Sequence, residues 1–371
     1  MQVLTRYVGD PGLRIVAEKV LSGSRISPEE GLLLYEKAEL SLLGLLAGNV
    51  RRRFNGNYVY FIRNFHIEPT NKCIYNCRFC SYHRDESDPE SWEFSADQMM
   101  EIVRRFDDKE VREVHIVGGV NPGRDLEYYG NLIRQIKSHR PELHVKAFSA
   151  IELEYMIKLS GLTVSEGLSM LRANGLDSVP GGGAEIFDEE IRHKICPGKT
   201  SAENWLKIHE TAHNLGIPSN ATILYGHIEG YHHRIDHMER IRNLQDRTHG
   251  FNAFIPLKYK KANNPMSPAG EISMAEDLRN YAVSRIYFDN ITHIKAYWPM
   301  TGKEIAALSL SFGADDLDGT IEDTTRIYSM AGAEEKNPSM GTEEICRLIR
   351  EAGFEPVERD SVYNFINTFA L

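Results

Sequence analysis

Three cysteines stand close together in the segment HIEPTNKCIYNCRFCSYHR, residues 66–84. Cys73, Cys77 and Cys80 have the spacing C-x3-C-x2-C. A 4Fe-4S cluster normally takes four thiolates, so three thiolates leave one iron without a protein ligand. S-adenosylmethionine (SAM) can chelate such an iron, and an electron passed to its sulfonium releases methionine and a 5′-deoxyadenosyl radical. The spacing therefore predicts a 4Fe-4S cluster that cleaves SAM.

Two alternative interpretations of these cysteines are a structural zinc site completed by His83 and three unrelated thiols. Structural zinc sites usually combine two paired motifs, and the sequence has only two further cysteines, Cys196 and Cys346, with no motif around either. Those two are expected to be small buried hydrophobic residues.

Three segments that follow predicted strands could contact SAM. Glycines in VGGVNP (117–122) let the backbone approach a ligand closely, although an ordinary tight turn would also use them. Ser149 and Glu152 could hold the methionine or ribose part, and a plain helix N-cap at Ser149 explains them equally well. PGGGAE (180–185) lacks the spacing of a dinucleotide fingerprint. The candidate SAM contacts are Gly118, Gly119, Val120, Ser149, Glu152, Gly182 and Glu185.

Polar residues also gather at the ends of predicted strands. Asn64, His66 and Glu68 share one face of their strand by period-two alternation. We expect His66, Glu68 and His227 to act in catalysis, with a structural role as the alternative. The candidate substrate contacts are Asn64, Tyr225, Glu229, Arg234, Lys258 and Trp298; a surface role is the alternative for Arg234 and Lys258, and core packing for Trp298.

Strands alternate with helices along most of the chain. The predicted strands are 58–67, 113–118, 144–149, 175–180, 219–225, 251–256 and 291–297. The predicted helices are 95–109, 126–139, 151–173 (as two helices), 201–215, 233–247 and 273–288. This alternation predicts an α/β fold, a full or partial (β/α) barrel, in which chemistry gathers at the carboxyl ends of the strands.

Three regions are expected: an N-terminal helical segment (1–55), the barrel (56–310) and a C-terminal extension packed on it (311–371). Ser27-Pro28-Glu29-Glu30 predicts a helix start, and that helix should end at Gly48. The run Arg51–Arg53 is expected at a solvated helix end. The segment 310–324 is expected to be an acidic loop, followed by a capped helix ending at Gly353.

Composition sets limits on partners and location. The net charge of 43 − 53 = −10 disfavours nucleic acid or an anionic membrane as the main partner. No apolar run is long enough to span a membrane, and no signal peptide is recognisable. Five cysteines, three of them clustered, favour a metal site in a reducing cytoplasm over a disulfide framework.

Several of these segments together resemble the aminofutalosine synthase family, radical SAM enzymes of the futalosine route to menaquinone. The resemblance covers residues 30–365 and rests on HIEPTNKCIYNCRFCSYHR, HIVGGVNP, GLDSVPGGGAEIF, ATILYGHIE and PVERDSVYNF. The cluster motif marks the whole superfamily. The segment GGGAEIF is shared with dehypoxanthine futalosine cyclase and the deazaflavin (FO) synthases, whereas YGHIE and ERDSVYN favour the synthase.

The resemblance implies a [4Fe-4S] cluster, SAM as co-substrate, and a flavodoxin- or ferredoxin-type reductant. The implied substrate is 3-[(1-carboxyvinyl)oxy]benzoate, an enol ether with two carboxylates. The implied reaction adds the 5′-deoxyadenosyl radical to the vinyl carbon. Attack on the ring and loss of carbon dioxide or bicarbonate then give 6-amino-6-deoxyfutalosine. Cationic or hydrogen-bonding groups should hold the two carboxylates in a dry cavity.

Two other functions are kept as alternatives. A cyclase or an FO-synthase-like enzyme would use the same radical to abstract hydrogen. A non-catalytic electron carrier would want all four irons capped by protein, which three clustered cysteines do not provide.

Overall fold

A ring of parallel strands forms the centre of the protein in a computed structural model, which describes residues 8–320, 326–333 and 339–369. Three sheets make up the strand system: β2-β3-β4, β5-β6-β7 and β10-β9-β1-β8. All neighbouring strands are parallel except β9 and β10. The strands are β1 Tyr58–Ile62, β2 Asn64–Ile67, β3 Glu113–Ile116, β4 His144–Ala147, β5 Ser219–Tyr225, β6 Phe251–Lys258, β7 His293–Ile294, β8 Asp316–Gly319, β9 Glu355–Arg359 and β10 Phe365–Thr368.

Isolated bridges join the three sheets into a closed barrel. Lys146 pairs with Ser178, and Val179 pairs with Ser219, so residues 178–179 link β4 to β5. Lys295 pairs with Asp316 and links β7 to β8. Because β1 pairs with β8 while β2 continues directly from β1 and pairs with β3, the ring closes on itself. The expected (β/α) barrel is therefore confirmed in its closed form.

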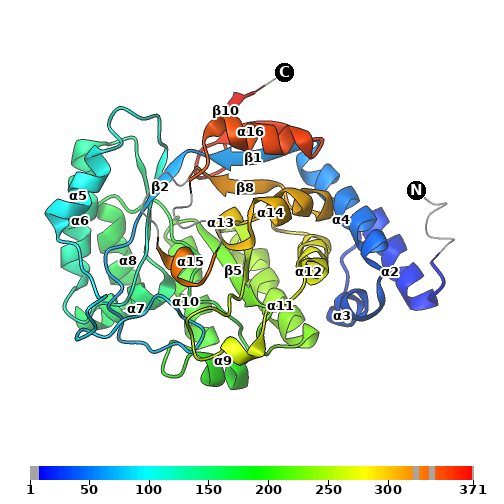
Figure 1. Ribbon diagram of the computed structural model, residues 1–371, viewed down its shortest axis with the longest axis horizontal. Helices are drawn as coiled ribbons and strands as arrows, with labels where there is room; N and C mark the ends of the chain where they lie inside the picture. The colour runs from blue at the N-terminus through cyan, green and yellow to red at the C-terminus, as the bar shows by residue number, and fades with distance from the viewer. Residues whose placement is uncertain (1–7, 321–325, 334–338, 370–371) are drawn as a thin grey trace.

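Helices surround the ring and lie between successive strands (Figure 1). The helices are α2 Pro11–Ser22, α3 Pro28–Lys37, α4 Leu40–Asn55, α5 Ala96–Arg104, α6 Leu126–His139, α7 Ala150–Leu159, α8 Val164–Ala173, α9 Glu189–Ile195, α10 Ala202–Asn214, α11 Tyr231–Thr248, η1 Ser267–Ala269, α12 Met274–Tyr287, α13 Trp298–Thr301, α14 Lys303–Ser309, η2 Leu310–Phe312, α15 Ile327–Met330 and α16 Thr342–Glu351. Capping boxes start α3, α5, α7 and α8, where the side chain of the N-cap residue and that of the third helical residue each bind the other's backbone N–H.

The helix expected over 28–48 is two helices, which is a correction. Chain direction changes at Ala38, whose carbonyl accepts a hydrogen bond from Arg279 at 2.7 Å, so α3 ends there. The second helix, α4, continues past Gly48 and ends at Gly56, the residue with a positive φ of 57°. A glycine stops a helix only where the chain turns into such a conformation.

Arg51 is also not at a solvated helix end, because it is 1% exposed. Its guanidinium donates to the carbonyls of Ala314 at 2.9 Å and Tyr58 at 2.6 Å. It therefore ties α4 to the barrel strands. Its neighbours Arg52 and Arg53 are exposed, as expected.

Three strand expectations were also wrong in extent. The segment 58–67 divides at Arg63 into β1 and β2, which belong to different sheets. The segment 175–180 forms only the two bridges at Ser178 and Val179, because it lies between Gly175, with φ 109°, and Pro180. The segment 291–297 contributes only β7.

The ring of strands extends past residue 310, because β8 lies within the segment expected to be an acidic loop. Beyond it, β9 lies on the other side of β1, and Figure 1 shows α16 beside this sheet. Residues 321–324 of the expected loop lie outside the described residues. The division into regions 1–55, 56–310 and 311–371 remains a prediction.

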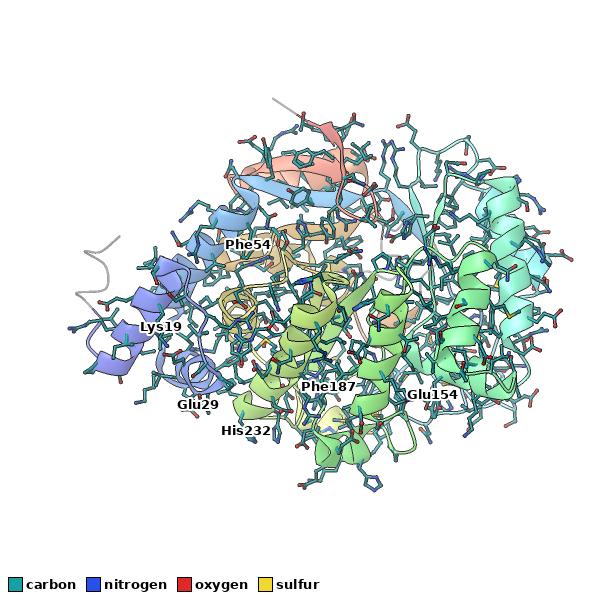
Figure 2. All side chains as sticks on the ribbon, turned by 180° about the vertical axis from the view of Figure 1, so that it is seen from behind. Lys19, Glu29, Phe54, Glu154, Phe187 and His232 are labelled. Carbon is teal, nitrogen blue, oxygen red and sulfur yellow. The ribbon has the colours of Figure 1, made fainter. Side chains whose placement is uncertain are left out.

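The apolar core lies between the ring and its helices. Seen from behind, α10 and α11 run side by side, with Phe187 labelled between them (Figure 2). The Phe187 ring lies 4.0 Å from that of His237 on α11 and 5.3 Å from that of Trp205 on α10, measured between centroids. Among the described residues, no helix is long and apolar enough to cross a membrane.

Candidate active site

The loop between β2 and α5 brings the three clustered cysteines to one cavity of about 170 Å³. Within the loop the Cys80 N–H donates to the Cys77 carbonyl at 3.0 Å. The loop is held from outside by two backbone bonds: Arg78 N–H to the Ile195 carbonyl (2.7 Å) and Ile74 N–H to the Val120 carbonyl (3.0 Å). Backbone contacts on both sides of the loop therefore hold the three cysteines at one cavity.

The arrangement of these thiols fits a cluster rather than a single ion. Among the residues that the structure describes, no three His, Cys, Asp or Glu side chains converge on a point that could hold one metal ion. A zinc site completed by His83 would need such convergence. Thiolates of a 4Fe-4S cluster each bind a different iron, so they surround a cavity instead. The residues present fit the cluster.

Lys199 provides positive charge in the same cavity. Burial raises the pKa of Cys77 to about 12, and Lys199 opposes this shift. Burial alone would lower the pKa of Lys199, but Cys77 and Glu185 raise it. Its ammonium lies 2.6 Å from Glu185 Oε1. A permanent cation beside the cysteines favours their thiolate forms, which are the forms that bind iron.

Gly118 and Gly119 line the cavity and lie against the backbone of the cysteine loop. A Cβ atom on Gly119 would lie 2.2 Å from the Lys72 carbonyl oxygen, and one on Gly118 would lie 2.8 Å from that of Thr70. The Gly119 N–H donates to the Thr70 carbonyl at 2.8 Å. These glycines allow two loops to pack together, a reason for glycine that the sequence interpretation did not include.

Ser149 and Glu152 form the capping box of α7, the plain helix cap that was kept as an alternative. Glu152 accepts from the Ser149 N–H at 2.7 Å and from the Gly118 N–H at 3.1 Å. Burial raises the pKa of Glu152 to about 7, and these hydrogen bonds oppose the shift. Glu152 therefore positions the Gly118 backbone at the cavity edge.

The segment 180–185 lies at the same cavity. Gly182 lines it, and the Gly182 carbonyl accepts from the Trp205 indole at 3.2 Å. Glu185 has a positive φ of 49°, which is uncommon for a residue with a side chain. Its carboxylate is held by Lys199, as described above.

A second cavity, of about 120 Å³, lies inside the barrel and adjoins the first, because Val117 and Gly182 line both. We call these the cluster cavity and the inner cavity. The inner cavity has a polar side and an apolar side. Its lining includes Asn64, His115, Lys146, Asn220, Thr222, Ile255, Leu257, Lys295, Tyr297 and Asp318.

Two buried ion pairs lie at the inner cavity. Lys146 on β4 lies 2.6 Å from Glu113 on β3, and Lys295 lies against Asp318 on β8. Burial lowers the pKa of Lys146, and Glu113 opposes the shift. Although burial alone would raise the pKa of Glu113, Lys146 holds it well below its usual value.

The three predicted polar residues of β2 and its end have different surroundings. Asn64 lines the inner cavity. The His66 ring packs edge-on against His115, with centroids 4.7 Å apart. Glu68 accepts the backbone N–H groups of Arg326 and Ile327 at 3.0 and 3.2 Å, so it holds the start of α15. Figure 1 shows α15 near the centre of the molecule.

The other predicted substrate contacts face the helices instead. Tyr225 and Lys258 both bind Asp277 of α12, at 2.9 and 2.7 Å. Arg234 binds Glu229 and Glu276, each at 2.8 Å. These residues line neither cavity.

His227 and Trp298 are likewise separate from the two cavities. His227 lies 3.2 Å from Glu229 and 3.1 Å from the Leu224 carbonyl. Burial lowers the pKa of His227, and Glu229 opposes this shift. Trp298 is fully buried, and its indole donates to the Gly319 carbonyl at 2.9 Å. For Trp298, core packing was the expected alternative.

Sequence interpretation missed Lys146, Lys295, Lys199 and His115. The first two and His115 each interrupt a predicted apolar strand (HVKAFS, ITHIKAY and EVHIVG) at an alternating position. The period-two argument applied to Asn64, His66 and Glu68 would have identified them. Lys199 follows a short helix and has no comparable signal.

Comparison with known proteins gives two matching family models. A model described as "Radical SAM superfamily" matches residues 67–241, and one described as "CofH/MqnC C-terminal region" matches residues 248–370.

Several relatives match nearly the whole chain. An aminodeoxyfutalosine synthase of Thermus thermophilus is 42% identical, over 98% of this chain and 98% of the relative. One of Streptomyces coelicolor is 38% identical, over 97% and 96%. A cyclic dehypoxanthine futalosine synthase of Streptomyces coelicolor is 37% identical, over 95% and 89%.

Among solved structures, methylornithine synthase is similar with a TM-score of 0.73, covering 92% of this chain and 97% of that one. The two sequences are 17% identical, so this similarity concerns the fold.

Proposed function

The chain belongs to the radical SAM superfamily, in the family that contains the aminodeoxyfutalosine synthases, and we propose that it is itself such a synthase. Its product would be 6-amino-6-deoxyfutalosine, which the names aminofutalosine and aminodeoxyfutalosine synthase both denote. The observation that carries the proposal is the 42% identity to a synthase along 98% of both chains. The adjoining cluster and inner cavities support it, because the reaction needs SAM and a second substrate side by side.

Membership in this superfamily implies a 4Fe-4S cluster and SAM. When bound, they supply the 5′-deoxyadenosyl radical. We propose that Cys73, Cys77 and Cys80 hold the cluster and leave one iron for SAM. Lys199 would offset the negative charge of the three thiolates, because it lies in the same cavity.

For SAM, we propose contacts with the backbone of residues 118–120 and with Gly182. All four residues line the cluster cavity. Ser149 lines it too. Glu152 would act through position, since its carboxylate holds the Gly118 N–H. We propose that the Glu185 carboxylate binds the ribose hydroxyls of SAM while it remains paired with the Lys199 ammonium.

For the second substrate, we propose 3-[(1-carboxyvinyl)oxy]benzoate. A carbon–carbon bond would form between its vinyl carbon and the 5′-carbon of SAM, and a carboxyl group would leave as carbon dioxide or bicarbonate. The barrel must hold the two carbons within about 3–3.5 Å of each other. His66 would orient the substrate or move a proton there, since its ring lies against His115 of the inner cavity. Glu68 would act by holding α15.

The reducing electron must come from another protein, and we propose a flavodoxin- or ferredoxin-type reductant. We also propose a cytoplasmic location, because thiols that bind iron need a reducing compartment.

The test is incubation of the anaerobically reconstituted enzyme with reductant, vinyl ether and SAM labelled in the adenosyl group. We expect the label in 6-amino-6-deoxyfutalosine and little in free 5′-deoxyadenosine. Label found only in 5′-deoxyadenosine, with the vinyl ether present, would refute the synthase and favour the cyclase. The cyclase is the second candidate because a relative of that name is 37% identical.

The same assay tests His66. We expect His66→Ala to retain its cluster and bind SAM while losing most product and releasing more 5′-deoxyadenosine. Normal coupling in this variant would return His66 to a structural role.

A further inference from the structure

The interior of this barrel contains charged side chains, whereas the interiors of parallel barrels are usually filled by branched apolar side chains. Lys146 and Lys295 both line the inner cavity, although they are 7% and 2% exposed. A buried ammonium is costly unless it is paired. Each lysine has its own acid, Glu113 or Asp318, on a neighbouring strand.

Each ammonium retains hydrogen-bonding capacity after its ion pair has formed. A lysine carries three N–H donors. Within the described part of the chain, Lys146 Nζ donates only to Glu113 and Lys295 Nζ only to Asp318. Two donors on each lysine therefore remain for a ligand in the cavity.

The two lysines also act on each other electrostatically. Burial lowers the pKa of Lys146 first, and the positive charge of Lys295 lowers it further. Two ammonium groups held at one cavity repel each other, and an anion between or beside them relieves this repulsion. The ion pairs keep the empty cavity close to neutral, so the fold tolerates both cations.

The other lining residues suit an aromatic acid. Ile255, Leu257 and Tyr297 supply apolar and aromatic surface, while Asn220 and Thr222 supply polar groups. Thr222 already donates to the Gly181 carbonyl at 2.6 Å, which leaves its oxygen to accept. An aromatic ring that bears separate carboxylates would match this combination.

We infer that Lys146 and Lys295 bind the two carboxylates of the substrate and select a dicarboxylate. This inference rests on the proposed function, because the vinyl ether is its substrate. These two lysines take the role that the sequence analysis gave to Arg234 and Lys258 as substrate contacts. Arg234 and Lys258 instead form ion pairs with Glu229, Glu276 and Asp277.

The test removes each cation together with its acid. Lys146→Met alone would leave Glu113 buried without a partner and could unfold the protein, so the variants are Lys146→Met/Glu113→Gln and Lys295→Met/Asp318→Asn. Lys258→Met/Asp277→Asn is the matched control, since it also replaces a buried lysine–aspartate pair but lines neither cavity. Iron content and circular dichroism check that each holoenzyme is folded.

Binding is measured by anaerobic calorimetry with two probes, the vinyl ether and 2-phenoxyacrylate, which lacks the ring carboxylate. We call the two double variants at Lys146 and Lys295 the lumen variants. Because each loses a charge-assisted hydrogen bond to a carboxylate, we expect each to bind the vinyl ether about 10- to 100-fold more weakly than wild type, and the control to bind it normally. One of the two lumen variants should also lose the wild-type preference for the vinyl ether over 2-phenoxyacrylate.

Vinyl-ether affinity within twofold of wild type in both lumen variants would overturn the inference, and so would an unchanged preference between the probes in both. The labelled-SAM assay on the wild type separates this failure from that of the function. Normal product with unaffected lysine variants refutes the inference alone. A wild type that forms no 6-amino-6-deoxyfutalosine refutes the function and the inference that rests on it.

Discussion

The cluster cavity and the inner cavity adjoin, yet they are built in opposite ways. The cysteines come from one loop within eight residues, and the glycines and capping residues around them follow single strands. The ion pairs at the inner cavity join residue 113 to 146 and residue 295 to 318, which come from separate segments of the chain. The cysteines form a recognisable motif because they are close along the chain, whereas the charges of the inner cavity can be recognised only one strand at a time, by their alternating positions.

The cavities also differ in how charge is held. In the cluster cavity one cation, Lys199, lies with the thiols and is paired with Glu185, whereas two lysines line the inner cavity and each is paired with its own acid. The first arrangement favours ligands that become negative on binding. The second keeps its charges balanced until a ligand arrives.

The largest effect is expected at the cysteine loop. Cys73→Ala, Cys77→Ala and Cys80→Ala should each abolish SAM cleavage, because each thiolate is proposed to hold a different iron. Iron content and methionine release after anaerobic reconstitution measure this. Cys346→Ala is the matched control: Cys346 is buried in α16, away from both cavities, and the variant should stay active. Full SAM cleavage in any of the three loop variants would contradict the assignment.

The next largest effect separates the two kinds of buried lysine. Lys258→Met should lower the free energy of unfolding by about 3–5 kcal/mol, because it leaves the buried Asp277 without its cation and with only the Tyr225 hydroxyl as a side-chain donor. The double variant Lys258→Met/Asp277→Asn should recover most of this loss in urea denaturation. Neither protein should change the KM for the vinyl ether. A raised KM in the folded double variant would place Lys258 back among the substrate contacts.

Gly119→Val tests whether the cluster cavity depends on packing between loops. The new side chain would meet the Lys72 carbonyl, so we expect a destabilisation of about 1–3 kcal/mol and a fall in cluster content. Gly123→Ala lies in the same loop, and its Cβ would be 3.4 Å from the nearest atom. That control should keep its iron. Equal iron content in the two variants would show that the close approach is unimportant.

A change that develops only gradually with pH is expected at Glu152. Burial raises its pKa from 4.5 to about 7, so its contribution to stability is complete below pH 4.5 and is lost as the pH rises through 7. Relative to Glu152→Gln, the wild type should lose about 1.4 kcal/mol of unfolding free energy per pH unit between about pH 5 and 7. Urea denaturation at several pH values measures the difference. Parallel curves for the two proteins would mean that Glu152 is ionised throughout.

Local signals in the sequence predicted most of the fold. Capping residues such as Ser149 placed helix starts correctly, because a cap acts within one turn. The break at Ala38 was not predicted: Ala38 has an extended backbone, and its carbonyl accepts a hydrogen bond from Arg279, which is far along the chain. The same reason explains Arg51: its partners Ala314 and Tyr58 become neighbours only in the folded barrel.

In the candidate site, residue type indicated a residue's location correctly where local backbone geometry fixes it. It was misleading where the location depends on ion pairs with side chains that are distant in the sequence. Cys77 and Gly119 lie where the sequence indicated. In the sequence, Lys258 follows one predicted apolar strand and Lys146 lies within another. One faces the helices and one faces the inner cavity, and this depends on which face of its strand each occupies.

The position of β1 has a consequence for synthesis of the chain on the ribosome. This strand, YVYFI, lies between β8 and β9, which are made more than 250 residues later. Until then both of its edges lack their native partners, and an apolar strand with open edges is prone to pair with other chains. The edges of β1 therefore stay open until β8 and β9 have been made, and the barrel can close only after β8 is available to pair with β1.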